Sequence, residues 1–177
     1  MQDANPREEG DRTFFNYSIE NLPFLLNCEY SNHAWSYTWD AYSIDPAGNK
    51  LDSVIPFNWS CNIENDQFGL WHEYDVVLNQ QVNPDCLMEH LNYQTSKNGC
   101  IDKVEINALN MITSLSKSPL KNNGSFGCDM GMRIYSILIF DQSTAYYKRV
   151  ILKTTGNKSL INESEFTDEL LNYFNRI

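Results

Sequence analysis

The sequence predicts a β-rich α+β domain, with antiparallel strands in one or more sheets and a C-terminal helix packed on the sheet. Three observations support this class. Apolar and polar residues alternate through much of the first half, two apolar runs flank a short turn at 141–144, and the last segment carries a helical apolar stripe. We also expect a helix near 102–116. At 177 residues the chain suits one domain, so we expect a disordered arm over 1–12 and one globular domain over 13–177.

Several segments of the first half have the alternation of half-buried strands. They cover residues 13–22, 24–30, 33–44 and 51–64, and 69–79 is a further candidate. Between the third and fourth lies DPAGNK (45–50), with Pro and Gly in their usual turn positions. Pro56 predicts an edge or a bulge in the strand that follows this turn.

The second half predicts a central hairpin followed by a helix. Residues 132–140 and 145–155 are hydrophobic in both phases, which is typical of strands buried on both faces. In the last segment, Asn162 and Glu165 have the spacing of a capping box. The apolar stripe behind it comprises Phe166, Leu170, Tyr173/Phe174 and Ile177.

The earlier helix has similar signals. Asp102 and Glu105 are its capping residues, and its apolar stripe comprises Val104, Ala108, Met111/Ile112 and Leu115. The alternation at its start, KVEI, leaves a strand as the alternative.

The charge balance restricts the possible partners. A net charge of −10 repels phosphate backbones and anionic lipids, so we expect neither nucleic-acid nor membrane-surface binding. A partner steered by this field would be basic, although the acidity also provides solubility. The longest apolar run, Ile137–Phe140, is too short for a membrane span. The polar start lacks the features of a signal peptide, so the chain is either cytosolic or the mature form of an exported protein.

The five cysteines predict either buried thiols or disulfides. No C-x-x-C pair or zinc-finger spacing occurs, and we expect neither metal nor cofactor. Strand phase directs Cys28 and Cys61 toward apolar faces, which makes them one candidate disulfide. Cys86 and Cys100 flank a polar segment and form the other candidate, leaving Cys128 as a possible free thiol.

Five acceptor sequences for asparagine-linked sugars occur in the chain. They begin at Asn16, Asn58, Asn123, Asn157 and Asn162. Asn16 and Asn58 lie on the polar phase of their predicted strands, and the next two lie in turn-like stretches. Together with the cysteines they favour an extracellular, secreted protein, with the bacterial periplasm as the alternative location.

Evidence for catalysis is weak. No nucleophile elbow, phosphate loop or metalloprotease motif is present. The acid–base candidates are His72 and His33, which would need a nearby carboxylate such as Asp40 or Asp75. A small extracytoplasmic hydrolase using His72 is therefore the alternative hypothesis.

Aromatic residues make up 13% of the chain, more than a core of this size needs. They indicate either a β-rich core or a recognition surface. The candidate binding residues are Trp35, Tyr37, Trp39, Tyr42 and Trp71. The favoured hypothesis is a non-catalytic, secreted glycoprotein domain that binds another protein, as an immune-modulating, receptor-binding or adhesion module.

Overall fold

The computed structural model describes residues 22–32, 38–53, 81–95, 104, 108–124 and 131–177. For residues 86, 89–95 and 108–110 it describes the backbone alone. The predicted arm at 1–12 and the predicted strands at 13–22 and 69–79 lie outside these ranges, apart from Leu22. The same holds for the 51–64 strand beyond Ser53.

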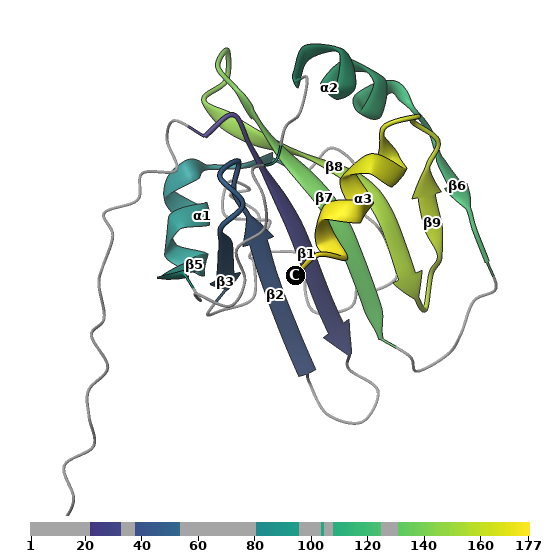
Figure 1. Ribbon diagram of the computed structural model, residues 1–177, viewed down its shortest axis with the longest axis horizontal. Helices are drawn as coiled ribbons and strands as arrows, with labels where there is room; N and C mark the ends of the chain where they lie inside the picture. The colour runs from purple at the N-terminus through teal and green to yellow at the C-terminus, as the bar shows by residue number, and fades with distance from the viewer. Residues whose placement is uncertain (1–21, 33–37, 54–80, 96–103, 105–107, 125–130) are drawn as a thin grey trace, which may run out of the picture.

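The described residues form one antiparallel sheet with helices on its faces, which confirms the predicted fold class (Figure 1). The strand order is β5-β3-β2-β1-β7-β8-β9-β6, and β4 also pairs with β8. The strands are β1 Phe24–Asn32, β2 Thr38–Ile44, β3 Lys50–Ser53, β4 Gln81–Val82, β5 Leu91–Thr95, β6 Leu120–Asn122, β7 Met132–Asp141, β8 Tyr146–Gly156 and β9 Leu160–Asn162. The helices are α1 Pro84–His90, α2 Ala108–Lys117 and α3 Thr167–Phe174.

The β7–β8 hairpin lies at the centre of the sheet, as predicted from its two apolar phases. β7 pairs with β1 on one side and with β8 on the other. At the turn, one carboxylate oxygen of Asp141 accepts hydrogen bonds from the backbone N–H and the hydroxyl of Ser143. The predicted turn at 45–50 is also present, with the Gly48 N–H donating to the Asp45 carbonyl.

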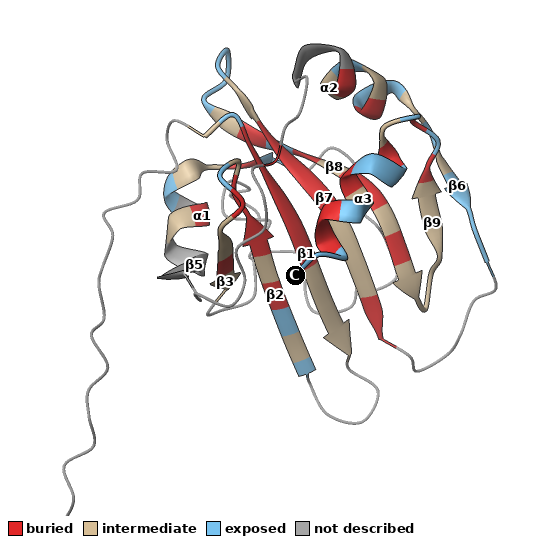
Figure 2. Ribbon diagram, in the orientation of Figure 1, coloured by how far each residue is buried: buried red, intermediate tan, exposed pale blue. Residues whose placement is uncertain are grey.

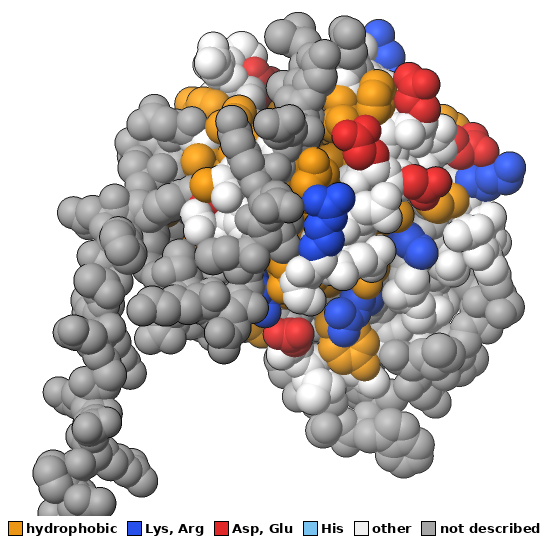
Figure 3. Space-filling model, viewed as in Figure 1, with side chains coloured by type: hydrophobic (Ala, Val, Ile, Leu, Met, Phe, Trp, Pro, Cys, Tyr) orange, Lys and Arg blue, Asp and Glu red, His pale blue; other side chains and the backbone are white. Residues whose placement is uncertain are grey.

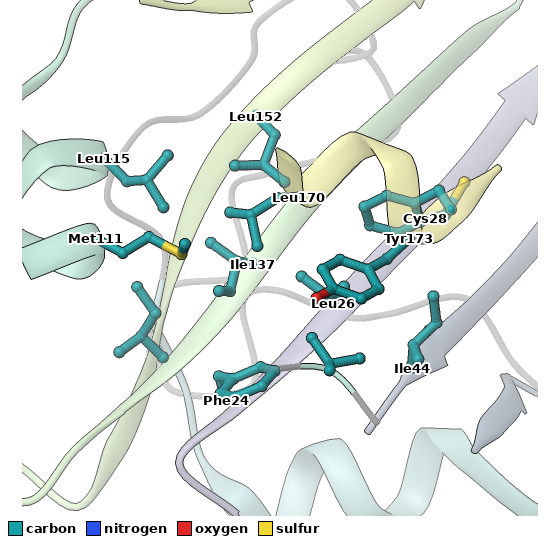
Figure 4. Close-up of a cluster of buried hydrophobic side chains, with 13 residues drawn as sticks. Phe24, Leu26, Cys28, Ile44, Met111, Leu115, Ile137, Leu152, Leu170 and Tyr173 are labelled. Atoms are coloured by element: carbon teal, nitrogen blue, oxygen red, sulfur yellow. The ribbon is translucent and has the colours of Figure 1, made fainter. Parts of the chain in front are cut away.

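Both faces of the sheet carry a buried apolar cluster. The larger cluster lies under α2 and α3, on what we call the helix-bearing face (Figure 4). It includes Leu26, Ile44, Ile137, Leu152 and Leu170. The smaller cluster lies on the opposite face, where α1 contributes to it, and comprises Leu25, Leu51, Val82, Leu87, Leu138 and Tyr147. Burial is therefore concentrated at Phe24–Cys28 of β1 and Ser136–Ile139 of β7 (Figure 2).

The earlier helix starts later than predicted. α2 begins at Ala108, and Val104 lies outside it, with its N–H donating to the Pro46 carbonyl. The Val104 side chain is nevertheless buried in the same cluster as Met111 and Leu115, so these three predicted core residues are confirmed. The predicted caps, Asp102 and Glu105, lie outside the described ranges. In the part of the chain that the structure describes, no helix is long and apolar enough to cross a bilayer.

The C-terminal helix is present, but its predicted capping box is wrong. α3 begins at Thr167, and Asn162 belongs to β9. The Asn162 side-chain amide donates to the carbonyls of Leu115, at 3.1 Å, and Ile151, at 3.2 Å. Its side chain therefore ties α2 and β8 together and cannot cap α3. Ile177, the predicted end of the apolar stripe, is exposed.

Two glycines allow the end of β8 to approach the start of β7. Gly131 and Gly156 have φ values of 69° and 98°, in the left-handed region that side chains rarely adopt. A Cβ on Gly156 would lie 2.0 Å from the Gly131 carbonyl oxygen, so the two backbones would have to separate. Gly124 provides a contrast, because its nearest neighbour, Ser159, would be at an ordinary contact distance of 3.4 Å.

We therefore expect Gly156→Ala to lower the free energy of unfolding by about 1 to 3 kcal/mol, because it combines a steric clash with backbone strain. Chemical denaturation followed by circular dichroism would measure the change. The matched control, Gly124→Ala, should change stability by less than about 0.5 kcal/mol. Equal effects of the two substitutions would contradict the close approach of β7 and β8.

Candidate functional site

The helix-bearing face is not uniformly covered by its helices. α3 lies over the middle of the sheet, and β1, β2 and β7 continue past its C-terminal end (Figure 1). Burial falls along this part of the strands, where β1 becomes half-buried and β2 becomes partly exposed (Figure 2). Side chains here can contact both the protein core and a partner.

Strand register brings one cysteine, three tyrosines and one arginine together at this end. Cys28 pairs with Tyr42 on one side and with Tyr135 on the other. Two residues along, Tyr30 pairs with Arg133. Because side chains alternate along strands, all five lie on the helix-bearing face. We call these five residues the tyrosine–arginine site.

Among the described residues, the neighbours that hold Arg133 carry no negative charge. Its guanidinium lies 5.3 Å from the centre of the Tyr30 ring, a cation–π distance. It also lies close enough to the Cys28 thiol and the Tyr135 hydroxyl to oppose the rise in the pKa of both groups. Tyr42 lies beside the same thiol, as its register partner on β2. These contacts fix the guanidinium in place without neutralising it.

α3 supports the site from the core side. The ring of Phe174 meets Tyr135 edge-on, with centroids 5.2 Å apart, and meets Tyr42 at 6.4 Å. Such edge-to-face pairs favour a defined ring orientation. Cys28 lies at the end of the apolar cluster, near the ring of Tyr173 (Figure 4). The site is therefore rigid on its inner side and half-exposed on its outer side.

Burial determines the protonation of the site. It raises the pKa of the Cys28 thiol to about 11, with the nearby Arg133 acting in the opposite direction. Burial also raises the pKa values of the Tyr42 and Tyr135 hydroxyls. All three groups are neutral at pH 7. A neutral, 2% exposed thiol is a poor nucleophile, so the site is suited to binding rather than covalent chemistry.

Two lysines flank the site. Lys50 lies 4.8 Å from the centre of the Tyr42 ring and forms an ion pair with Asp52 at 3.2 Å. Lys153 pairs in register with Tyr135, on the same face. Figure 3 shows Lys and Arg side chains gathered with hydrophobic ones in the middle of this face. The surface thus combines aromatic rings with positive charge.

The opposite face carries a buried polar network. Arg149 forms an ion pair with Glu29 at 3.2 Å and donates to the Ser136 hydroxyl. Asn27 donates to Glu29 and accepts from Ser43. Burial lowers the pKa of Arg149, and Glu29 acts in the opposite direction. These polar groups bond to one another across four strands, which is typical of a structural network.

A cavity of about 480 Å³ lies beside β8. Among the described residues, its lining includes Leu115, Ile151, Lys148 and Asn162 but no histidine, cysteine or carboxylate. The Asn162 amide already donates to the backbone on two sides. The cavity therefore offers no acid–base pair. In the part of the chain that is described, no cluster of His, Cys, Asp and Glu could hold a metal ion either.

Two of the five predicted aromatic binding residues, Trp39 and Tyr42, belong to the described part of the chain. Trp39 and Tyr42 lie on opposite faces of the sheet, since Trp39 pairs with Ser31 and Tyr42 with Cys28. Tyr42 belongs to the tyrosine–arginine site. Trp35, Tyr37 and Trp71 lie outside the described residues, as do the candidate acid–base residues His33 and His72.

The predicted disulfide between Cys28 and Cys61 is not present, because Cys28 is a free, buried thiol. Its sulfur contacts Tyr42 and Arg133. Strand phase correctly predicted that Cys28 points toward the apolar face. It did not predict which residues Cys28 meets there. Cys86 lies in α1, with only its backbone described. Cys61, Cys100 and Cys128 lie outside the described residues.

The candidate glycosylation sites differ in accessibility. Asn123 is exposed just after β6, and Asn157 is half-exposed after β8. Asn162 is 3% exposed and uses its side-chain nitrogen in two hydrogen bonds, so the folded protein has no room for a sugar there. Asn16 and Asn58 lie outside the described residues.

Sequence reasoning did not identify Arg133, Tyr135, Tyr30 or Lys153 as site residues. One feature of the sequence could have indicated them. Arg133 and Tyr135 are two positions apart in an apolar strand and so share a face, and a charged residue is unusual in such a strand. Their convergence with Tyr42 depends on the pairing of β1 with both neighbours. Single-strand patterns do not show that pairing.

Comparison of the chain with protein-family models, curated protein sequences and solved structures gave no match.

We expect the buried thiol to make stability depend on alkaline pH. Its folded-state pKa of about 11 exceeds its ordinary value of 9.0, so its contribution is complete below pH 9 and is lost as pH rises to about 11. The loss is about 3 kcal/mol. Urea denaturation under reducing conditions at pH 8 to 11 would measure it.

Cys28→Ala is the control for this pH dependence. The substitution lowers stability by a pH-independent amount but removes the thiol's titration. Subtracting the two curves isolates the contribution of Cys28 from that of every other titrating group. Parallel curves for the two proteins would contradict the burial of the thiol.

Proposed function

We propose that the protein is a non-catalytic recognition domain that binds another protein through the tyrosine–arginine site. The observation that carries this proposal is the half-exposed group of Tyr30, Tyr42, Tyr135 and Arg133 on a rigid sheet. Tyr and Arg are enriched among residues that dominate binding energy at protein interfaces. Side chains already held in position lose little entropy on binding.

The chemistry of the site supports binding over catalysis. Its only thiol is neutral and buried, and the hydroxyls of Tyr42 and Tyr135 have raised pKa values. The large cavity that the structure describes lacks acid–base groups along its described lining. The alternative hydrolase depends on His72, which lies outside the described residues.

We further propose that the protein is a secreted glycoprotein. The support comes from the acceptor sequences, of which the one at Asn123 is exposed. The cysteine content is a second support. Because Cys28 is free, the four remaining cysteines are an even set that two disulfides would use completely.

The binding proposal predicts that substitutions at the site weaken binding without unfolding the protein. Immobilised protein would capture partners from the extracellular fluid of its natural setting, and dissociation constants would then be measured for the captured protein. We expect Arg133→Ala and Tyr30→Ala each to weaken binding about tenfold or more.

Matched controls come from the far parts of the sheet. Lys121→Ala removes an exposed cation that forms a surface ion pair with Glu163, and Tyr146→Ala removes a tyrosine at the β7–β8 turn. Both should leave binding within about twofold of the parent. Thermal unfolding would verify that each variant is folded. Unchanged binding by the folded site variants would refute the proposal.

The glycoprotein proposal predicts a sugar at Asn123. The chain would be expressed behind a secretory leader in eukaryotic cells, and gel mobility would be compared before and after deglycosylation. Asn123→Gln should reduce the change in gel mobility on deglycosylation by the contribution of one glycan, because the Asn123 side chain is exposed. Asn162→Gln should remove none, because Asn162 is buried. A secreted product without any deglycosylation shift would count against the proposal.

A further inference from the structure

The acidity of the chain as a whole does not extend to the tyrosine–arginine site. The net charge is −10, which by itself would favour a basic partner. At the site, however, the fixed charges are mainly positive. They belong to Arg133, Lys153 and Lys50. The local charge at the tyrosine–arginine site therefore differs from the net charge of the chain.

Arg133 lacks an acidic partner within the described ranges. The ion pairs found there join Lys50 to Asp52, Lys121 to Glu163, Lys148 to Asp141 and Arg149 to Glu29. Neither Arg133 nor Lys153 belongs to this set. The other sheet arginine, Arg149, is neutralised by Glu29, so the contrast between the two is a feature of this sheet.

The acidic residues near the site do not cancel its charge. In its two rows of side chains, the acidic positions are Asp52, which pairs in register with Tyr42, and Asp40, which pairs with Tyr30. Asp52 is engaged by Lys50. Asp40 is exposed and lies on β2, with β1 between it and Arg133. Among the described residues, the Arg133 guanidinium is therefore oriented by Tyr30 and has no acidic partner.

From this charge pattern we infer that the partner presents a short acidic segment of polypeptide to the site, with carboxylates bound by Arg133 and Lys153. This inference rests on the proposed function and names the chemistry of its partner. A guanidinium held over Tyr30 can bind a carboxylate through two parallel hydrogen bonds. The surrounding tyrosine rings supply apolar contact to the carbon chains of the same segment.

The overall charge favours a short segment over a long polyanion. A nucleic acid or a sulfated polysaccharide would extend beyond the site into the field of a chain with net charge −10, which repels it. A few carboxylates placed at Arg133 would gain the local attraction and avoid most of that repulsion. Attraction between exposed charges is screened by salt, so the binding should weaken as salt is added.

The test uses a fluorescein-labelled decapeptide of glutamate, with a glutamine decapeptide as the neutral control, and follows fluorescence anisotropy of the full chain. We expect the glutamate peptide to bind and the glutamine peptide to bind about tenfold more weakly or not at all. Arg133→Gln and Lys153→Gln should each weaken binding of the glutamate peptide, and we expect Arg133→Gln to do so by about tenfold. Lys121→Gln should leave binding of this peptide unchanged. Binding should also fall between low and high salt.

Several results would overturn the inference. They are absence of binding at millimolar peptide, equal binding of both peptides, or unchanged binding by a folded Arg133→Gln protein. Tighter binding of a single-stranded oligonucleotide or of heparin would indicate that the partner is a polyanion and not an acidic segment of polypeptide. If Tyr30→Ala weakens binding of the captured protein partner but Arg133→Gln does not, the proposed recognition site is supported and the acidic-segment inference is wrong.

Discussion

The pairing register of β1 with its two neighbours is the constraint on which both faces of the sheet depend. Cys28 lies between Tyr42 and Tyr135, and Asn27 pairs with Ser43 and Ser136. A slip of one residue would turn the tyrosines toward the buried network and the network toward α3. The hydrogen bonds of Asn27 and the Glu29–Arg149 ion pair are satisfied in this register. The network on one face thus maintains the site on the other.

The two sheet arginines illustrate how environment assigns a role. Arg149 is buried, and Glu29 supplies its counter-charge within the protein, so it contributes to the internal network. Arg133 lies where α3 no longer covers the sheet, and its neighbours are a thiol and tyrosine rings. The same side chain is structural where its charge is paired inside and available for recognition where it is not.

Much of the architecture could be predicted because it follows from local periodicity. The two-phase apolar runs identified the central β7–β8 hairpin, and the stripe of Leu170, Tyr173 and Phe174 identified α3. The capping box at Asn162 failed because its side chain bonds instead to Leu115 and Ile151, which are distant in sequence. The Cys28 disulfide failed for a related reason. Phase gives the face toward which a side chain points but not the residue that it meets.

The sequence by itself determined the antiparallel α+β class, the central hairpin, the C-terminal helix and the overall acidity. These properties follow from composition and from patterns within single segments. Tertiary structure alone decided that Cys28 stays a thiol, that Asn162 is buried, and that Arg133 lies against Tyr30. Each of these depends on residues from different strands meeting in one register, and a one-dimensional pattern does not contain those contacts.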